Sequence, residues 1–99
     1  MSRLTLADAD RIADRSLAAG AEHGFAPLCV VVLDAGAHPL VVKRDERASI
    51  NRADIATAKA AGCLAMGFGG RELARRAGAV PHFFASLNTV LPKGIVAVP

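Results

Sequence analysis

The chain has no tryptophan and no tyrosine among its 99 residues, and only four phenylalanines. Because tryptophan and tyrosine anchor many protein interfaces, the sequence offers few residues of the kind that form a binding hot spot. The hydrophobic fraction of 53% comes mostly from alanine and valine. We therefore expect a core of small side chains, in which helices and strands approach one another closely.

Cysteine is also scarce, with Cys29 in an apolar run and Cys63 among alanines. Neither has a close partner in the sequence, so reduced core residues are expected rather than a disulfide or a metal site. The three histidines, His23, His38 and His82, lack the i, i+4 spacing of metal ligands, and a structural zinc or calcium site is not expected.

Long apolar segments are absent too. The longest run covers residues 27–33, whereas a membrane-spanning helix needs about 20 apolar residues. The N-terminus has no apolar signal core. With the reduced cysteines, these absences predict a cytoplasmic protein with no membrane partner.

The net charge of +3 does not come from one basic surface. Within residues 43–47 cations alternate with acids, and the densest basic cluster is Arg71, Arg75 and Arg76. Nucleic-acid binders usually gather basic residues on one face, often beside stacking aromatics, so no nucleic-acid partner is expected. A chain of this length is sufficient for one domain with one core.

The hydrophobic pattern predicts the order α-β-β-α-α-α-β. Thr5 is the expected N-cap of a first helix whose apolar face repeats at three- and four-residue steps and which ends near residues 20–24. The β-favouring run of residues 28–33 and the return at 40–43 flank turn chemistry and predict a hairpin. Later elements are helices over 53–66 and 71–77, a short helix from Pro81, and a third strand over 95–98.

Five segments, in the correct order, carry a family resemblance: LTLA at 4–7, VVLDAG at 31–36, DIA and KA within 54–60, GFGGRELA at 67–74 and VAVP at 96–99. With them the chain resembles the GlcG/HbpS-like family, whose domain is labelled haem-binding or haem-degrading. The resemblance implies an α/β (α+β), profilin-like fold, with an antiparallel sheet flanked by helices. It also implies one domain over residues 1–99 and assembly into homo-oligomers.

Relatives continue beyond the position of Pro99 with two more strands and a final helix, so the resemblance implies that this chain is C-terminally short. The alternatives are a truncated chain, a frameshifted gene and a genuinely short member. The sheet would then have an exposed edge, which favours pairing with another subunit. Some relatives bind haem, but the resemblance does not settle whether a reaction is catalysed. Ser49 and Ser86 lie in no recognisable nucleophile motif, so the sequence leaves enzymatic activity open.

His38 is the candidate iron ligand, because it follows the Asp34–Ala37 turn at a position where family members often carry histidine. A neutral imidazole on an exposed loop can bind haem iron. The alternative is a polar turn residue that hydrogen-bonds to nearby backbone. His23, at the end of the first helix, is expected to interact with the negative helix end, and His82 is expected to be exposed.

Two cations are candidate anchors for haem propionates. Lys59 is the lone charge in a helix of small apolar residues, and the family pattern carries a lysine there; the alternatives are a solvent-directed side chain or an ion pair with Asp54 or Glu72. Arg71 follows the glycine break, where a helix N-terminus can bind an anion; the alternative is a close-packed helix junction.

Three functions follow as hypotheses. The first is binding of haem or a related cofactor by His38, Lys59 and Arg71. The second is an auxiliary enzyme acting on a small carboxylate held by Lys59, and the third is an assembly module without chemistry of its own.

Overall fold

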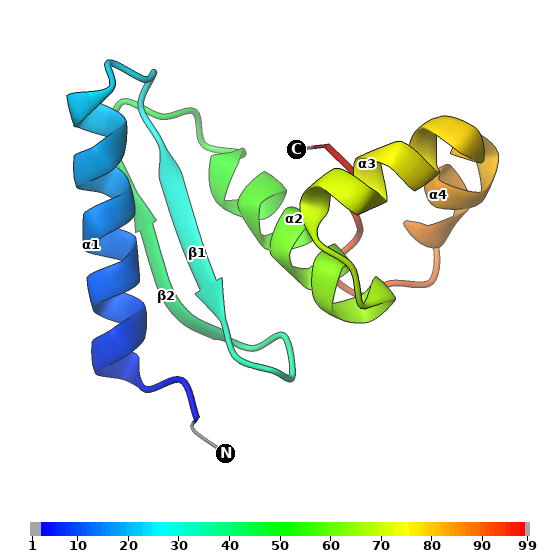
Figure 1. The fold of residues 1–99 in the computed structure, drawn as a ribbon, viewed down its shortest axis with the longest axis horizontal. Coiled ribbons are helices and arrows are strands. Elements are labelled where there is room, and N and C mark those ends of the chain that lie inside the picture. The colour runs from blue at the N-terminus through cyan, green and yellow to red at the C-terminus, as the bar shows by residue number, and fades with distance from the viewer. Residues whose placement is uncertain (1–2, 99) are drawn as a thin grey trace. The chain divides into compact units, whose positions relative to one another are not determined.

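The computed structural model describes residues 3–98 as a mixed α+β chain (Figure 1). Its elements are α1 (Leu6–Glu22), β1 (Cys29–Leu33), β2 (Pro39–Arg44), α2 (Arg52–Met66), α3 (Gly70–Ala79) and α4 (Pro81–Leu87). The first six predicted elements are confirmed in type and order. The chain forms two compact units, one ending at Ala56 and the other beginning at Thr57. None of the helices in the described range has the length and apolar character needed to cross a bilayer.

Helix α1 begins at the predicted cap. The hydroxyl of Thr5 accepts a hydrogen bond from the N–H of Asp8 at 3.1 Å, which satisfies a backbone donor that the first helical turn leaves unpaired. Ala9 and Ala13 lie on the predicted apolar face and are fully buried, whereas Leu6 on the same face is 62% exposed. The small residues in the middle of α1 therefore carry its packing.

The hairpin of β1 and β2 is antiparallel and contains one irregularity. Val32 pairs with Val41, but Leu33 pairs with Pro39, so Leu40 is an extra residue on β2. For this reason the consecutive residues Leu40 and Val41 both reach the same core. Every residue of β1 is half-buried, so the full coverage on both faces that its apolar run predicts is not reached.

The core of the first unit lies between α1 and the hairpin, and it joins Ala9, Ala13 and Val41 with Val30, Val32 and Leu40. At the other end of α1 the side chain of Leu28 packs over Gly20. A methyl group at Gly20 would overlap the Leu28 side chain. The expected close approach of helix and strand thus depends on alanine and glycine.

The second unit is helical and has its own core. Gly67, with a positive φ of 78°, follows α2 in a conformation that favours glycine, and Pro81 occupies the first turn of α4 as predicted. Leu73 is fully buried, and Phe84 and Ile95 are nearly so. Together they form one apolar cluster.

The predicted third strand is wrong: residues 95–98 form no strand. The N–H of Ile95 instead donates to Oδ1 of Asn88 at 2.8 Å, and Ile95 and Ala97 pack into the helical core of the second unit. A strand needs a neighbouring strand to hydrogen-bond with, whereas here the β-favouring side chains stabilise the segment by packing against helices.

Candidate functional site

The turn that carries His38 is held by one carboxylate. Oδ1 of Asp34 accepts hydrogen bonds from the N–H groups of Gly36 and His38, each at 2.9 Å. The N–H of Asp34 in turn donates to the carbonyl of His38 at 2.8 Å. Ala37 has a left-handed φ of 66°, which a non-glycine residue adopts only when its surroundings compensate. The turn is therefore a closed, well-defined loop.

The imidazole of His38 is exposed and lies against Gly36. A methyl group placed on Gly36 would come within 3.1 Å of Cδ2 and 3.4 Å of Nε2. The backbone of His38 takes part in the hydrogen bonds of the turn, through its N–H to the Asp34 carboxylate and through its carbonyl to the Asp34 N–H. Its ring nitrogens have no hydrogen-bond or ion-pair partner within residues 3–98, so they are available to a ligand.

A hollow of about 830 Å³ lies beside this turn. It is lined by Arg3, Leu4, Thr5, Leu33, Asp34, Ala35, Gly36 and Leu40. Its volume falls in the range of about 300–1,000 Å³ that is usual for cofactor and small-molecule sites. His38 itself is not among these lining residues, but its ring lies against Gly36, which is one of them. Sequence reasoning missed Arg3 and Leu40, because only the fold brings the start of α1 and the bulge of β2 to the same turn.

Lys59 lies on α2 and is half-buried. The predicted ion pairs with Asp54 and Glu72 are not formed, and the Lys59 ammonium has no ion-pair partner in the described chain. Hydrogen bonds from Arg75 and Arg76 occupy the Glu72 carboxylate instead and lower its pKa from 4.5 to about 2. Lys59 is thus a half-buried cation available to an anion.

Arg71 is the second residue of α3 and is exposed. Gly69, the N-cap of this helix, supplies no side-chain hydrogen bond to it. Nothing lies within 4 Å of a methyl group placed on Gly69, so the junction is open rather than close-packed at this glycine.

His38 belongs to the first unit, whereas Lys59 and Arg71 belong to the second. That all three hold one ligand stays a prediction. The other histidines behave as expected. Nδ1 of His23 lies 2.8 Å from the carbonyl of Ala19 at the end of α1, and His82 is exposed.

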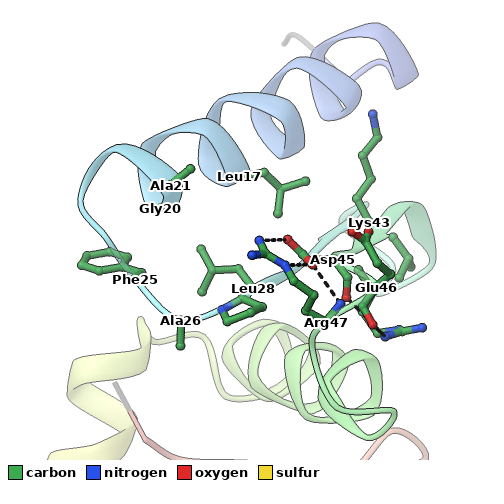
Figure 2. A pocket seen from close by; sticks show the side chains of 13 residues that line it. Leu17, Gly20, Ala21, Phe25, Ala26, Leu28, Lys43, Asp45, Glu46 and Arg47 are labelled. Carbon is green, nitrogen blue, oxygen red and sulfur yellow. Dashed lines mark hydrogen bonds and ion pairs between the residues drawn. The ribbon is translucent and has the colours of Figure 1, made fainter.

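A second concave site of about 530 Å³ lies entirely within the first unit; we call it the Phe25 groove (Figure 2). Its walls come from the end of α1, the connection to β1, and the end of β2 with the loop that follows. The lining residues are Leu17, Gly20, Ala21, Phe25, Ala26, Pro27, Leu28, Val42, Lys43, Arg44, Asp45, Glu46 and Arg47. The groove thus combines an apolar wall with a charged one.

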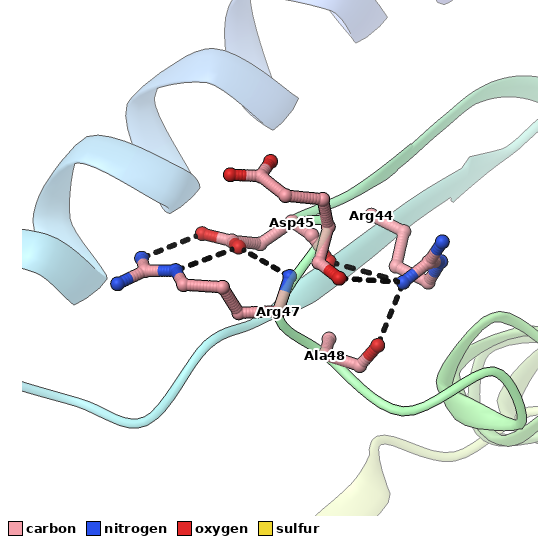
Figure 3. Close-up of polar contacts among 5 residues, drawn as sticks. Arg44, Asp45, Arg47 and Ala48 are labelled. Carbon is pink, nitrogen blue, oxygen red and sulfur yellow. Dashed lines mark hydrogen bonds and ion pairs between the residues drawn. The ribbon is translucent and has the colours of Figure 1, made fainter.

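The charged wall is shaped by two arginines in different roles (Figure 3). Nη1 of Arg44 donates to the carbonyl of Ala48 at 2.6 Å and to those of Asp45 and Glu46 at longer distances, which folds the loop around the guanidinium. Arg47 donates from Nε and Nη2 to the two oxygens of Asp45, at 3.0 and 2.9 Å. These hydrogen bonds lower the pKa of Asp45 from 3.8 to about 2.

Lys43 and Cys29 flank the charged wall. The Lys43 ammonium donates to Asp10 and Asp14, both at 2.7 Å, and these contacts raise its pKa. Burial raises the pKa of the Cys29 thiol, and nearby Arg44 opposes that shift only in part. A thiol with a raised pKa is a poor nucleophile. Cys29 is half-buried, so the expected full burial of this cysteine in the core is not reached.

Residues 4–99 match the family described as haem degrading protein HbpS-like. No curated protein and no solved structure matches the chain significantly.

Proposed function

Because the chain belongs to the HbpS-like family, whose description concerns haem, we propose that it binds haem or a related cofactor with His38 as the iron ligand. One observation carries the proposal: an exposed imidazole without a ring partner lies against Gly36, one of the residues that line a hollow of cofactor size. Neutral imidazole is a common axial ligand of haem iron. When bound, the haem would supply an iron centre, and His38 would hold it.

The lining of the hollow suits such a group. Leu4, Leu33 and Leu40 offer apolar surface to a flat hydrophobic ring, and Arg3 offers a cation to a propionate. Lys59 and Arg71 remain the further propionate anchors that we propose. The half-buried, unpaired ammonium of Lys59 and the exposed guanidinium of Arg71 support their roles.

The test is a hemin titration of the purified protein, followed by visible absorption. We expect a saturable, stoichiometric Soret shift, and we expect His38→Ala to lose the spectrum of histidine-ligated haem. His23→Ala and His82→Ala are matched controls that should keep it. A spectrum unchanged in His38→Ala would exclude this ligand, and diffuse, non-saturating binding would overturn the proposal.

A second candidate function rests on Lys59 alone. A half-buried lysine without an ion pair can hold the carboxylate of a small acid, in an auxiliary enzyme acting on such substrates. We expect glycolate to raise the melting temperature of the protein and the neutral analogue ethylene glycol to leave it unchanged. The shift should disappear in Lys59→Met, and its persistence there would contradict the role of Lys59.

We further propose that residues 1–99 form a single domain, which acts in the cytoplasm as a homo-oligomer. The sheet has two strands, and the outer edges of both lack a strand partner in the described chain. Such edges favour pairing with a second copy. Light scattering coupled to size exclusion should give a mass above that of one chain, and a monodisperse monomer would contradict the proposal.

A further inference from the structure

We propose that the Phe25 groove is a second binding site, which takes a small uncharged molecule with an apolar body and a carboxamide group. The groove shares none of its lining residues with the hollow beside His38. The inference therefore stands apart from the proposed haem function. It follows from how the two walls of the groove differ.

The apolar wall provides the surface for the body of the ligand. Figure 2 shows Leu17, Phe25 and Leu28 around the open space, on segments that come from α1 and from the connection to β1. The ring of Phe25 is 63% exposed, although burying a phenylalanine is worth roughly 1.5–3 kcal/mol. Leu28 is held in place because its side chain packs over Gly20. An apolar or aromatic ring of the ligand would cover these side chains.

Arg47 provides the hydrogen-bond donors. A guanidinium has five N–H groups, and two of those of Arg47 are used by Asp45. The remaining donors lie on the side away from that carboxylate, and Figure 2 shows the guanidinium projecting toward the interior of the groove. The fork with Asp45 fixes the orientation of these donors, so a ligand carbonyl would meet a pre-organised partner.

Glu46 provides the acceptor. Glu46 lines the same groove, and its carboxylate has no ion-pair partner in the described residues. A carboxamide carries one carbonyl acceptor, and the nitrogen bonded to the same carbon carries N–H donors. The carbonyl would accept from Arg47 while the N–H group donates to Glu46, so both polar groups of the wall are satisfied by one functional group.

The charges of the wall select against ions. A ligand carboxylate that accepts from Arg47 would be repelled by Asp45 and Glu46, and a ligand ammonium that donates to Glu46 would be repelled by Arg47. The one nearby ammonium, that of Lys43, is held by Asp10 and Asp14 and is not available to neutralise an anion. Because repulsion between like charges disfavours both a ligand anion and a ligand cation, an uncharged ligand fits the groove best.

Three probes of similar shape and different charge test the proposal: phenylacetamide, phenylacetate and 2-phenylethylammonium. Each is titrated into the isotope-labelled protein and followed by NMR. We expect saturable shifts for phenylacetamide, confined to resonances of the groove residues. The two ions should bind about tenfold more weakly, since each leaves one hydrogen bond with the wall unmade and adds repulsion. Equal affinity for the ions, or shifts spread over the chain, would overturn the proposal.

Variants separate the two polar contacts. Arg47→Gln and Glu46→Gln should each weaken phenylacetamide binding about tenfold, and Glu46→Gln should also improve phenylacetate binding. Arg15→Gln, which changes an exposed arginine outside the groove, should leave all three affinities unchanged. Shift dispersion of resonances outside the groove verifies that each variant is folded. Unchanged phenylacetamide binding in folded Arg47→Gln would contradict the inference, whatever the outcome with hemin.

Discussion

Asp34 and His38 are joined in both directions: Oδ1 of Asp34 accepts from the N–H of His38 at 2.9 Å, while the N–H of Asp34 donates to the carbonyl of His38 at 2.8 Å. The backbone of the candidate ligand is therefore fixed before any cofactor arrives. Less of the binding free energy is then spent on ordering the ligand residue.

A methyl group on Gly36 should displace the ring of His38. In Gly36→Ala the new Cβ would lie 3.1 Å from Cδ2, so the imidazole has to move by a few tenths of an ångström, and we expect hemin binding to weaken by up to about tenfold. Ring resonances of His38 in the cofactor-free protein should shift as well. Ala37→Gly, which relieves a left-handed residue, is the control that should preserve both readouts. Unmoved ring resonances in Gly36→Ala would refute the positioning role, independently of haem.

A methyl group on Gly62 should destabilise the second unit. It would lie 2.6 Å from Cγ1 of Ile95, a residue that is only 5% exposed. Alanine is the better helix former, but overpacking costs about 1–3 kcal/mol and should outweigh that gain. Urea unfolding of Gly62→Ala measures the loss. In an Ile95→Ala background the same change should cost less, and an equal cost in both backgrounds would show that the contact is not the cause.

The ion pair between Asp45 and Arg47 in the Phe25 groove should persist to low pH. The pKa of Asp45 is lowered from 3.8 to about 2 by hydrogen bonds from Arg47, so the folded state binds a proton less readily than the unfolded chain. The stability that the pair adds is complete above pH 3.8 and is lost as the pH falls toward 2. A carbon-detected titration of the Asp45 carboxyl should report the low midpoint. Arg47→Gln should return that midpoint toward its ordinary value, and a midpoint insensitive to this change would contradict the assigned cause.

The N-cap of α1 should contribute measurably to the free energy of unfolding. Thr5→Ala removes the hydroxyl that accepts from Asp8 and should cost about 1 kcal/mol of unfolding free energy. Thr5→Ser keeps the hydroxyl and should cost little. Chemical denaturation of the three proteins checks the order, and equal stability of the alanine and serine variants would show that the hydrogen bond contributes nothing.

Local features were predictable from the sequence, and non-local ones were not. The cap at Thr5 and the turn after Asp34 depend on side chains that hydrogen-bond within a few residues, so residue type and order were sufficient. Residues 95–98 were misassigned because strand propensity describes the side chains and not the partner. Ile95 meets α2 and the Leu73 cluster rather than another strand.

The sites divide in the same way. His38 was identified from its position in a short motif, whereas Arg47 looked like one of several interspersed charges. Its role depends on the loop conformation that Arg44 stabilises by donating hydrogen bonds to three backbone carbonyls, and no spacing rule describes that conformation. A basic residue two positions after an acidic one is too common in protein sequences to identify a residue that lines a binding site.

The contact between Gly62 and Ile95 also bears on how the chain is made. A glycine inside a helix costs about 1 kcal/mol relative to alanine, and in α2 that cost is offset by the side chain of Ile95, which packs where a methyl group would otherwise stand. Ile95 leaves the ribosome long after Gly62. Until Ile95 emerges, the side of α2 at Gly62 has no packing partner, and the helix is less stable. The nascent second unit should therefore remain accessible to chaperones for longer than the first unit, which contains the hairpin.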